Sequence, residues 1–67
     1  MNEYKVMFSY IDTDGRRRTE EDTALAFTSY EAGEIVEREY SDLEDLRIEE
    51  IWIDRNNRWE LVESWKI

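Results

Sequence analysis

The sequence predicts an α+β fold in the order strand-strand-helix-strand-strand (ββαββ), and three observations lead to it. Apolar and polar residues alternate in two segments near the N-terminus, apolar residues recur at helical spacing in the middle, and alternation returns in two segments near the C-terminus. Two hairpins joined through a helix form a four-stranded, mostly antiparallel sheet with the helix packed on one face. At 67 residues, without a linker or repeat, the chain is expected to be a single domain covering residues 1–67.

The first hairpin is predicted from residues 3–11 and 17–27, joined by the turn residues Asp12 to Gly15. On the first strand the residues expected on one apolar face are Tyr4, Val6, Phe8 and Tyr10. On the return strand, we expect Thr23, Leu25 and Phe27 to face inward and Ala24 and Ala26 to face outward. The three arginines that follow the turn, residues 16–18, are interpreted as a solvated hairpin end.

A helix is predicted to begin after Thr28, because Thr28 and Glu31 form the T-x-x-E pattern of a capping box. Its apolar stripe is Ala32, Ile35, Val36, Tyr40 and Leu43. Gly33 costs about 1 kcal/mol relative to alanine inside a helix, so either another element packs closely against it or the helix is locally weak. A second such pattern, Ser41 to Glu44, indicates a short turn.

The second hairpin is predicted from residues 46–54 and 58–67, with residues 55–57 as its turn. The apolar parity changes within the third strand, and a bulge at Glu49-Glu50 explains the change. Trp59 and Trp65 share the inward parity of the last strand and are expected in the core. Trp52 has the opposite parity from its isoleucine neighbours, which makes it a candidate exposed anchor.

One helix covers only one face of such a sheet, so the other face is expected to be partly open. The residues expected there are Met7, Ile11, Ala24, Ala26, Trp52 and Val62. An open apolar face is a candidate surface for self-association or for binding a partner.

The chain carries 18 Asp and Glu against nine Lys and Arg, a formal charge of −9. This charge would repel nucleic acid and anionic membranes, so neither is expected as a direct partner. The sequence contains neither Cys nor His, which excludes disulfides and thiolate metal sites and removes the commonest general base. With no apolar run long enough to span a membrane and an acidic start unlike a signal peptide, a cytoplasmic location is expected.

No motif indicates catalysis or a cofactor. The segment Asp12 to Gly15 shares part of a calcium-loop pattern, but Tyr10 occupies the first ligand position and three arginines follow. A pair of carboxylates working as acid and base needs a cleft, for which a domain this thin has little room. We therefore expect a protein that is not an enzyme and that uses no metal and no cofactor.

The acidic residues provide the sharper hypothesis. Glu31, Glu34 and Glu37 recur every three residues on the exposed helix face, with carboxylates about 5–6 Å apart. The candidate partner-binding residues are these three with Asp42, Glu44, Asp45, Glu49, Glu50 and Trp52. Such rows roughly imitate a nucleic-acid backbone and would fit a basic groove built for DNA or RNA. Solubility, or salt adaptation in a chain with only two lysines, would also explain the charge.

The overall pattern resembles small acidic phage-encoded inhibitors of bacterial defence, in particular anti-CRISPR proteins. The segment Ala26 to Val36, AFTSYEAGEIV, is similar to the strand-to-helix entry of many short phage proteins. The resemblance implies a non-enzymatic inhibitor or adaptor in the host-cell cytoplasm whose partner is a CRISPR effector complex or another basic nucleic-acid-binding protein. The alternative is a structural or self-associating module, a homodimer through the open sheet face, with the acidic surface serving solubility or salt adaptation.

Overall fold

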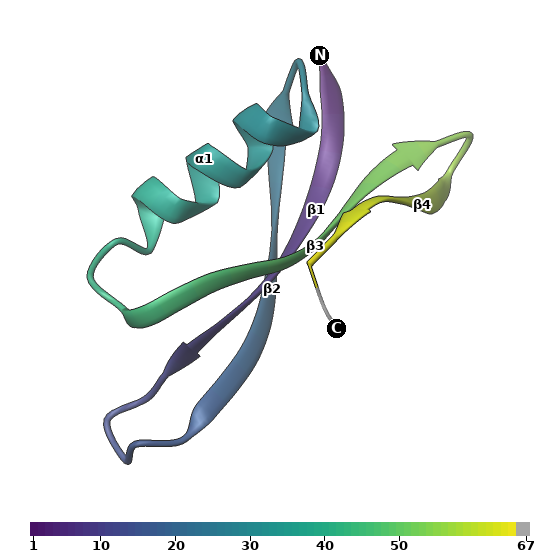
Figure 1. The fold of residues 1–67 in the computed structure, drawn as a ribbon. Helices are drawn as coiled ribbons and strands as arrows, with labels where there is room; N and C mark the ends of the chain where they lie inside the picture. The colour runs from purple at the N-terminus through teal and green to yellow at the C-terminus, as the bar shows by residue number, and fades with distance from the viewer. Residues whose placement is uncertain (66–67) are drawn as a thin grey trace.

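The structure is a computed structural model and describes residues 1–65. Its elements are β1 (Asn2–Ile11), β2 (Arg17–Ala26), α1 (Ser29–Glu39), β3 (Glu44–Arg55) and β4 (Arg58–Ser64). The strands form one twisted sheet in the order β2-β1-β3-β4 with every pairing antiparallel (Figure 1). The predicted α+β fold, ββαββ, is confirmed. Lys66 and Ile67, which the prediction included in the last strand, lie outside the described residues.

The core lies between α1 and the strands β1, β2 and β3. Figure 1 shows α1 along one side of these strands, with β4 on the far side of β3. The buried hydrophobic residues are Tyr4, Val6, Phe8, Ala24, Ala26, Ala32, Val36, Ile51 and Ile53. Tyr10 packs against this cluster. The alternation predicted for the first strand is therefore confirmed.

The predicted orientation of β2 is wrong. Tyr4 pairs with Ala24 and Asn2 with Ala26, and directly paired residues share a face of the sheet. Because Tyr4 faces α1, both alanines are buried beneath the helix, whereas Leu25 and Phe27 are 63% and 66% exposed and Thr23 is exposed too. The physical reason is space, since small side chains let the helix lie close to the edge strand.

The predicted bulge in β3 is confirmed. Met7 pairs with Glu50 and Phe8 with Ile48, which leaves Glu49 as the extra residue. As a result Ile48 and Ile51 both lie on the helix side of the sheet. Two further register shifts were not predicted from the sequence. One lies between β1 and β3, where Ser9 pairs with Arg47 and Ile11 with Glu44. The other is a bulge in β4, where Ile51 pairs with Glu63 and Trp52 with Leu61.

The predicted core positions of two tryptophans are wrong. Trp59 is 38% exposed and Trp65 is 54% exposed, and every residue of β4 is exposed. The helix packs on the other three strands, so the edge strand β4 has no layer above it. Trp59 instead lies on the open face with Trp52, and the Lys5 Nζ atom is 5.1 Å and 5.4 Å from the centroids of these two rings.

The helix start and the second hairpin turn follow the local sequence. The Thr28 hydroxyl accepts a hydrogen bond of 3.1 Å from the Glu31 amide, so the predicted helix start at Thr28 is confirmed. The Glu31 carboxylate accepts a hydrogen bond of 3.4 Å from the Phe27 amide, one residue before the cap, and not from Thr28 as a full capping box would require. Asn56 and Asn57 both have positive φ, as a two-residue hairpin turn requires. Among residues 1–65, no helix is both long and apolar enough to cross a membrane.

Gly33 is buried because another element packs closely against it. An ideal Cβ atom at this position would stand 3.4 Å from the Cδ1 atom of Ile51, so even one methyl group would touch β3. Of the two explanations that the sequence left open, close packing is the one observed.

Candidate functional site

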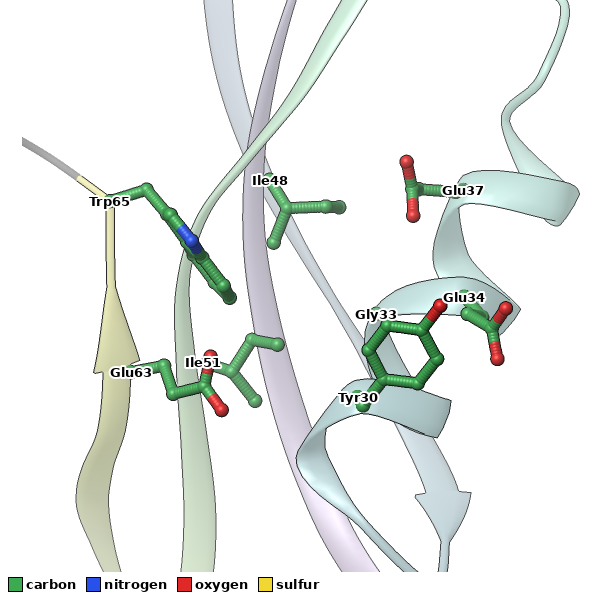
Figure 2. A pocket seen from close by; sticks show the side chains of 8 residues that line it. All are labelled: Tyr30, Gly33, Glu34, Glu37, Ile48, Ile51, Glu63 and Trp65. Atoms are coloured by element: carbon green, nitrogen blue, oxygen red, sulfur yellow. The ribbon is translucent and has the colours of Figure 1, made fainter.

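A groove of about 280 Å³ lies between α1 and the β3–β4 hairpin. Gly33 of the helix and Ile48 and Ile51 of β3 form its apolar floor, and two aromatic residues stand on its walls, Tyr30 from α1 and Trp65 just after β4 (Figure 2). The groove exists because β4 extends the sheet beyond the edge of the helix. Tyr30 is 73% exposed and Trp65 is 54% exposed, so each wall presents a large ring to solvent.

Three carboxylates surround this apolar floor. Glu34 and Glu37 come from α1, and Glu63 comes from β4 on the opposite wall. In Figure 2 the carboxyl groups of Glu37 and Glu63 point from the two walls toward the isoleucines between them. The Ser29 hydroxyl donates a hydrogen bond of 3.0 Å to Glu63 Oε1, which joins the first turn of the helix to β4.

Glu63 is the groove carboxylate that sequence reasoning missed, and the rings of Tyr30 and Trp65 were not predicted as site residues either. The parity of Glu63 disagrees with that of its neighbours on the last strand, and the bulge at Val62 is the cause. The bulge places Glu63 opposite Ile51, on the helix side of the sheet, and so brings it to the groove. The disagreement in parity was the available signal.

The ion pairs of the described residues lie away from the groove. Within residues 1–65 they join Lys5 to Glu21, Arg17 and Arg47 to Asp45, Arg18 to Asp12, and Arg55 to Glu60. Of the predicted acidic site residues, only Asp45 takes part in these pairs, and it takes part in two of them. The three groove carboxylates therefore keep charge that no described cation neutralises.

The structure gives several of the predicted site residues other surroundings. Glu31 is half-buried as the capping partner of the helix start. Asp45 is held by two arginines on the open side of the sheet. Glu50 accepts a hydrogen bond of 3.2 Å from the Trp52 indole, and this half-buried pair also lies on the open face. Trp52 is thus on the other side of the sheet from Glu34 and Glu37.

The remaining predicted residues lie near the far end of α1 and in the β3 bulge. Asp42 and Glu44 line a shallower hollow of about 190 Å³ together with Ile11 and Asp12. Glu49 is the half-buried bulge residue, and its carbonyl accepts a hydrogen bond of 2.8 Å from the Trp65 amide. The predicted acidic residues therefore do not converge on one surface, and Glu34 and Glu37 are the two that line the groove together.

The arginine run after the first turn is more structured than a solvated hairpin end. Arg17 crosses β1 and donates a hydrogen bond of 2.8 Å to Ser9, a fully buried polar residue, before pairing with Asp45. Arg18 pairs with Asp12 at 2.6 Å. These cations are already engaged within the protein and are not part of the groove.

The fold and the groove together define a small α+β protein. On the helix side of its sheet, exposed aromatic rings lie beside carboxylates that form no ion pair within residues 1–65. In the described part of the chain, no group of three or more acidic side chains is arranged to hold a metal ion. Comparisons of the sequence with protein-family models and curated proteins, and of the fold with solved structures, gave no match.

Proposed function

We propose that the protein is a non-enzymatic inhibitor or adaptor that docks the acidic helix side onto a basic surface of a nucleic-acid-handling protein, such as a CRISPR effector complex. One observation carries the proposal. Glu34, Glu37 and Glu63 gather at a single groove between exposed aromatic rings, while the ion pairs of residues 1–65 use other carboxylates.

The charge supports fast and selective encounter. Unpaired carboxylates on one side of a chain with net charge −9 produce a negative field that attracts a basic surface and raises the association rate. Tyr30 and Trp65 add apolar area beside those charges, and aromatic residues are enriched among the contacts that dominate binding free energy. Charge would thus set the rate of association, and the rings would slow dissociation.

The same arrangement accounts for inhibition. A basic groove that holds DNA or RNA binds mainly through phosphate contacts, and carboxylates spaced about 5–6 Å apart on a helix offer it an alternative anion. The protein would then compete with nucleic acid for its partner without binding nucleic acid itself. Such an inhibitor acts in the compartment of its target, the cytoplasm of the host cell if the protein is phage-encoded.

Affinity capture from a nuclease-treated bacterial lysate tests this proposal. We expect a basic nucleic-acid-binding protein to be retained at low salt, released at high salt, and displaced by added DNA or RNA. A double variant, Glu34→Lys with Glu37→Lys, should lose the partner. The matched control is Glu3→Lys with Asp14→Lys, which changes the net charge equally at two exposed carboxylates away from the groove. Equal capture by both double variants would refute the proposed surface.

A second candidate function, a self-associating module, is favoured by the open face of the sheet. Leu25 and Leu61 are 63% and 49% exposed there, beside half-buried Met7 and Trp52. A dimer through this face would depend on Met7 and Trp52 and would be insensitive to salt, because apolar contacts are not screened. Sedimentation at low and high salt separates the two candidates.

A further inference from the structure

We infer that the groove between α1 and β4 receives an arginine side chain of the partner protein. This inference rests on the proposed function and adds to it the residue type that is recognised. The guanidinium group would pair with Glu37 and Glu63 and stack on the exposed rings of Tyr30 and Trp65, and the aliphatic part of the side chain would lie on the floor.

The size of the groove fits a single long side chain. Sites for drug-sized molecules usually enclose about 300–1,000 Å³, and this groove, at about 280 Å³, lies just below that range. Gly33 contributes to its shape, because the absence of a side chain there leaves the floor to the isoleucines of β3. A groove of this size therefore has room for one long side chain.

The lining matches both parts of an arginine. Ile48 and Ile51 offer apolar contact to the three methylene groups, which long cationic side chains bury while the charged end stays near water. The carboxylates stand around this floor on opposite walls, as Figure 2 shows for Glu37 and Glu63. An apolar floor beneath unpaired carboxylates is complementary to a cation with an aliphatic stem.

The aromatic walls favour arginine over lysine. A planar guanidinium stacks on an aromatic face and still donates to carboxylates in its own plane, whereas an ammonium is a compact and strongly hydrated charge. Tyr30, Glu34 and Glu37 are spaced i, i+4 and i+7, so one face of α1 presents the ring and two carboxylates together.

The opposite face of the sheet contains the same combination of groups with a cation of the protein in place. There Lys5 lies over the rings of Trp52 and Trp59, and its Nζ atom is 3.9 Å from Glu21. The groove offers two rings and three carboxylates, and within residues 1–65 no ion pair joins these carboxylates to a cation. This internal example supports a cation as the occupant of the groove.

One carboxylate is already fixed in position. The Ser29 hydroxyl binds Glu63 Oε1 at 3.0 Å, which limits the motion of that side chain and leaves its other oxygen free to accept from a guanidinium. Because the hydrogen bond also holds β4 to the helix, both walls of the groove are joined before any partner arrives. Such preorganisation reduces the entropy lost on binding.

Titration with two peptides of equal charge, hexa-arginine and hexa-lysine, tests the inference at low salt. Nuclear magnetic resonance would follow the Trp65 indole and the amides of Tyr30 and Glu37. We expect hexa-arginine to bind about two- to fivefold more tightly than hexa-lysine, the range that stacking on exposed rings provides, and to shift these signals most.

Matched variants identify the groups responsible. Tyr30→Ala should abolish the preference, so that hexa-arginine and hexa-lysine bind with about equal affinity. Phe27→Ala removes a similarly exposed ring outside the groove and should preserve the preference for hexa-arginine. Glu37→Gln should weaken hexa-arginine binding more than Glu39→Gln, which removes the same charge from the same helix but does not line the groove.

The possible outcomes distinguish failure of the arginine site from failure of the proposed acidic docking. Equal affinity for the two peptides, or equal loss in Glu37→Gln and Glu39→Gln, would overturn the arginine site while leaving a salt-dependent acidic surface intact. If neither peptide bound wild-type protein at low salt, both the arginine site and the proposed acidic docking would be refuted.

Discussion

The hydroxyl of Tyr40 donates a hydrogen bond of 2.7 Å to the carboxylate of Asp22, joining the end of α1 to the edge strand β2. The Tyr40 ring also lies 4.7 Å, centroid to centroid, from the ring of Phe8 in the core. The hydrogen bond, with burial and the nearby carboxylate charges, raises the pKa of Tyr40 to about 12. The phenol that closes the helix onto the sheet thus keeps its proton at high pH.

Stability should therefore decline in alkali in a way that depends on Tyr40. A tyrosine in the unfolded chain loses its proton near pH 10, whereas Tyr40 in the folded protein loses its proton near pH 12. The protonated Tyr40 therefore stabilises the fold fully below pH 10, and this stabilisation is lost between about pH 10 and 12. Tyr40→Phe should lower the free energy of unfolding by about 1 kcal/mol at pH 7 and remove this part of the decline. Urea unfolding from pH 7 to 12 measures both effects. An unchanged decline in Tyr40→Phe would contradict this assignment.

Substitution of Gly33 should reveal how closely α1 lies against β3. Gly33→Val places γ carbons beyond a Cβ atom that already touches Ile51 at 3.4 Å, so we expect a loss of about 1–3 kcal/mol. Gly33→Ala adds only the touching methyl and gains helix propensity, so its stability should stay within about 1 kcal/mol of wild type. Thermal unfolding compares the two. Equal stability of the valine and alanine variants would show that the contact is not tight.

The helix start depends on the Thr28 hydroxyl. Thr28→Ala removes the acceptor for the Glu31 amide and should cost about 1 kcal/mol of unfolding free energy. Thr28→Ser keeps the hydroxyl and serves as the control, with stability close to wild type. Chemical denaturation followed by circular dichroism distinguishes them. If the serine variant lost as much as the alanine variant, the methyl group rather than the cap would be responsible.

Arg17 and its neighbour Arg16 should differ in their effect on stability. Arg17→Met leaves the buried Ser9 hydroxyl without its donor and breaks the pair with Asp45, for an expected loss of about 1 kcal/mol. Arg16→Met removes the same charge from an exposed side chain and should change stability by less than about 0.5 kcal/mol. Urea midpoints of the two variants, measured side by side, give the comparison. Similar losses would assign the effect to charge alone.

Salt should stabilise the protein, but the fold should not require it. Repulsion within a chain of net charge −9 weakens as salt screens it, so the melting temperature should rise between 10 mM and 500 mM NaCl. The protein should nevertheless be folded at 10 mM. Circular dichroism melts at the two concentrations check this expectation. An unfolded protein at 10 mM NaCl would favour adaptation to high salt as the reason for the acidic surface.

The sequence alone determined the elements whose signals lie within a few residues. The structure contains the alternation of Tyr4, Val6 and Phe8, the helix cap at Thr28 and the bulge at Glu49. Each depends on local chemistry: side-chain parity, a cap that spans one helical turn, or a change of phase within one strand. Local patterns of this kind do not need the rest of the fold to be interpreted.

Only the tertiary structure decided which side of each edge strand faces the helix and which carboxylates meet. β2 turns its alanines inward because the helix needs space. Trp59 of β4 is exposed because it lies on the open face of the sheet, and Trp65 is exposed on the wall of the groove just after β4. The contact of Ser29 with Glu63 joins residues 34 positions apart. Such relationships depend on strand order, register and the position of one helix over three of the four strands. These features arise from packing between elements and not from the pattern within any one of them.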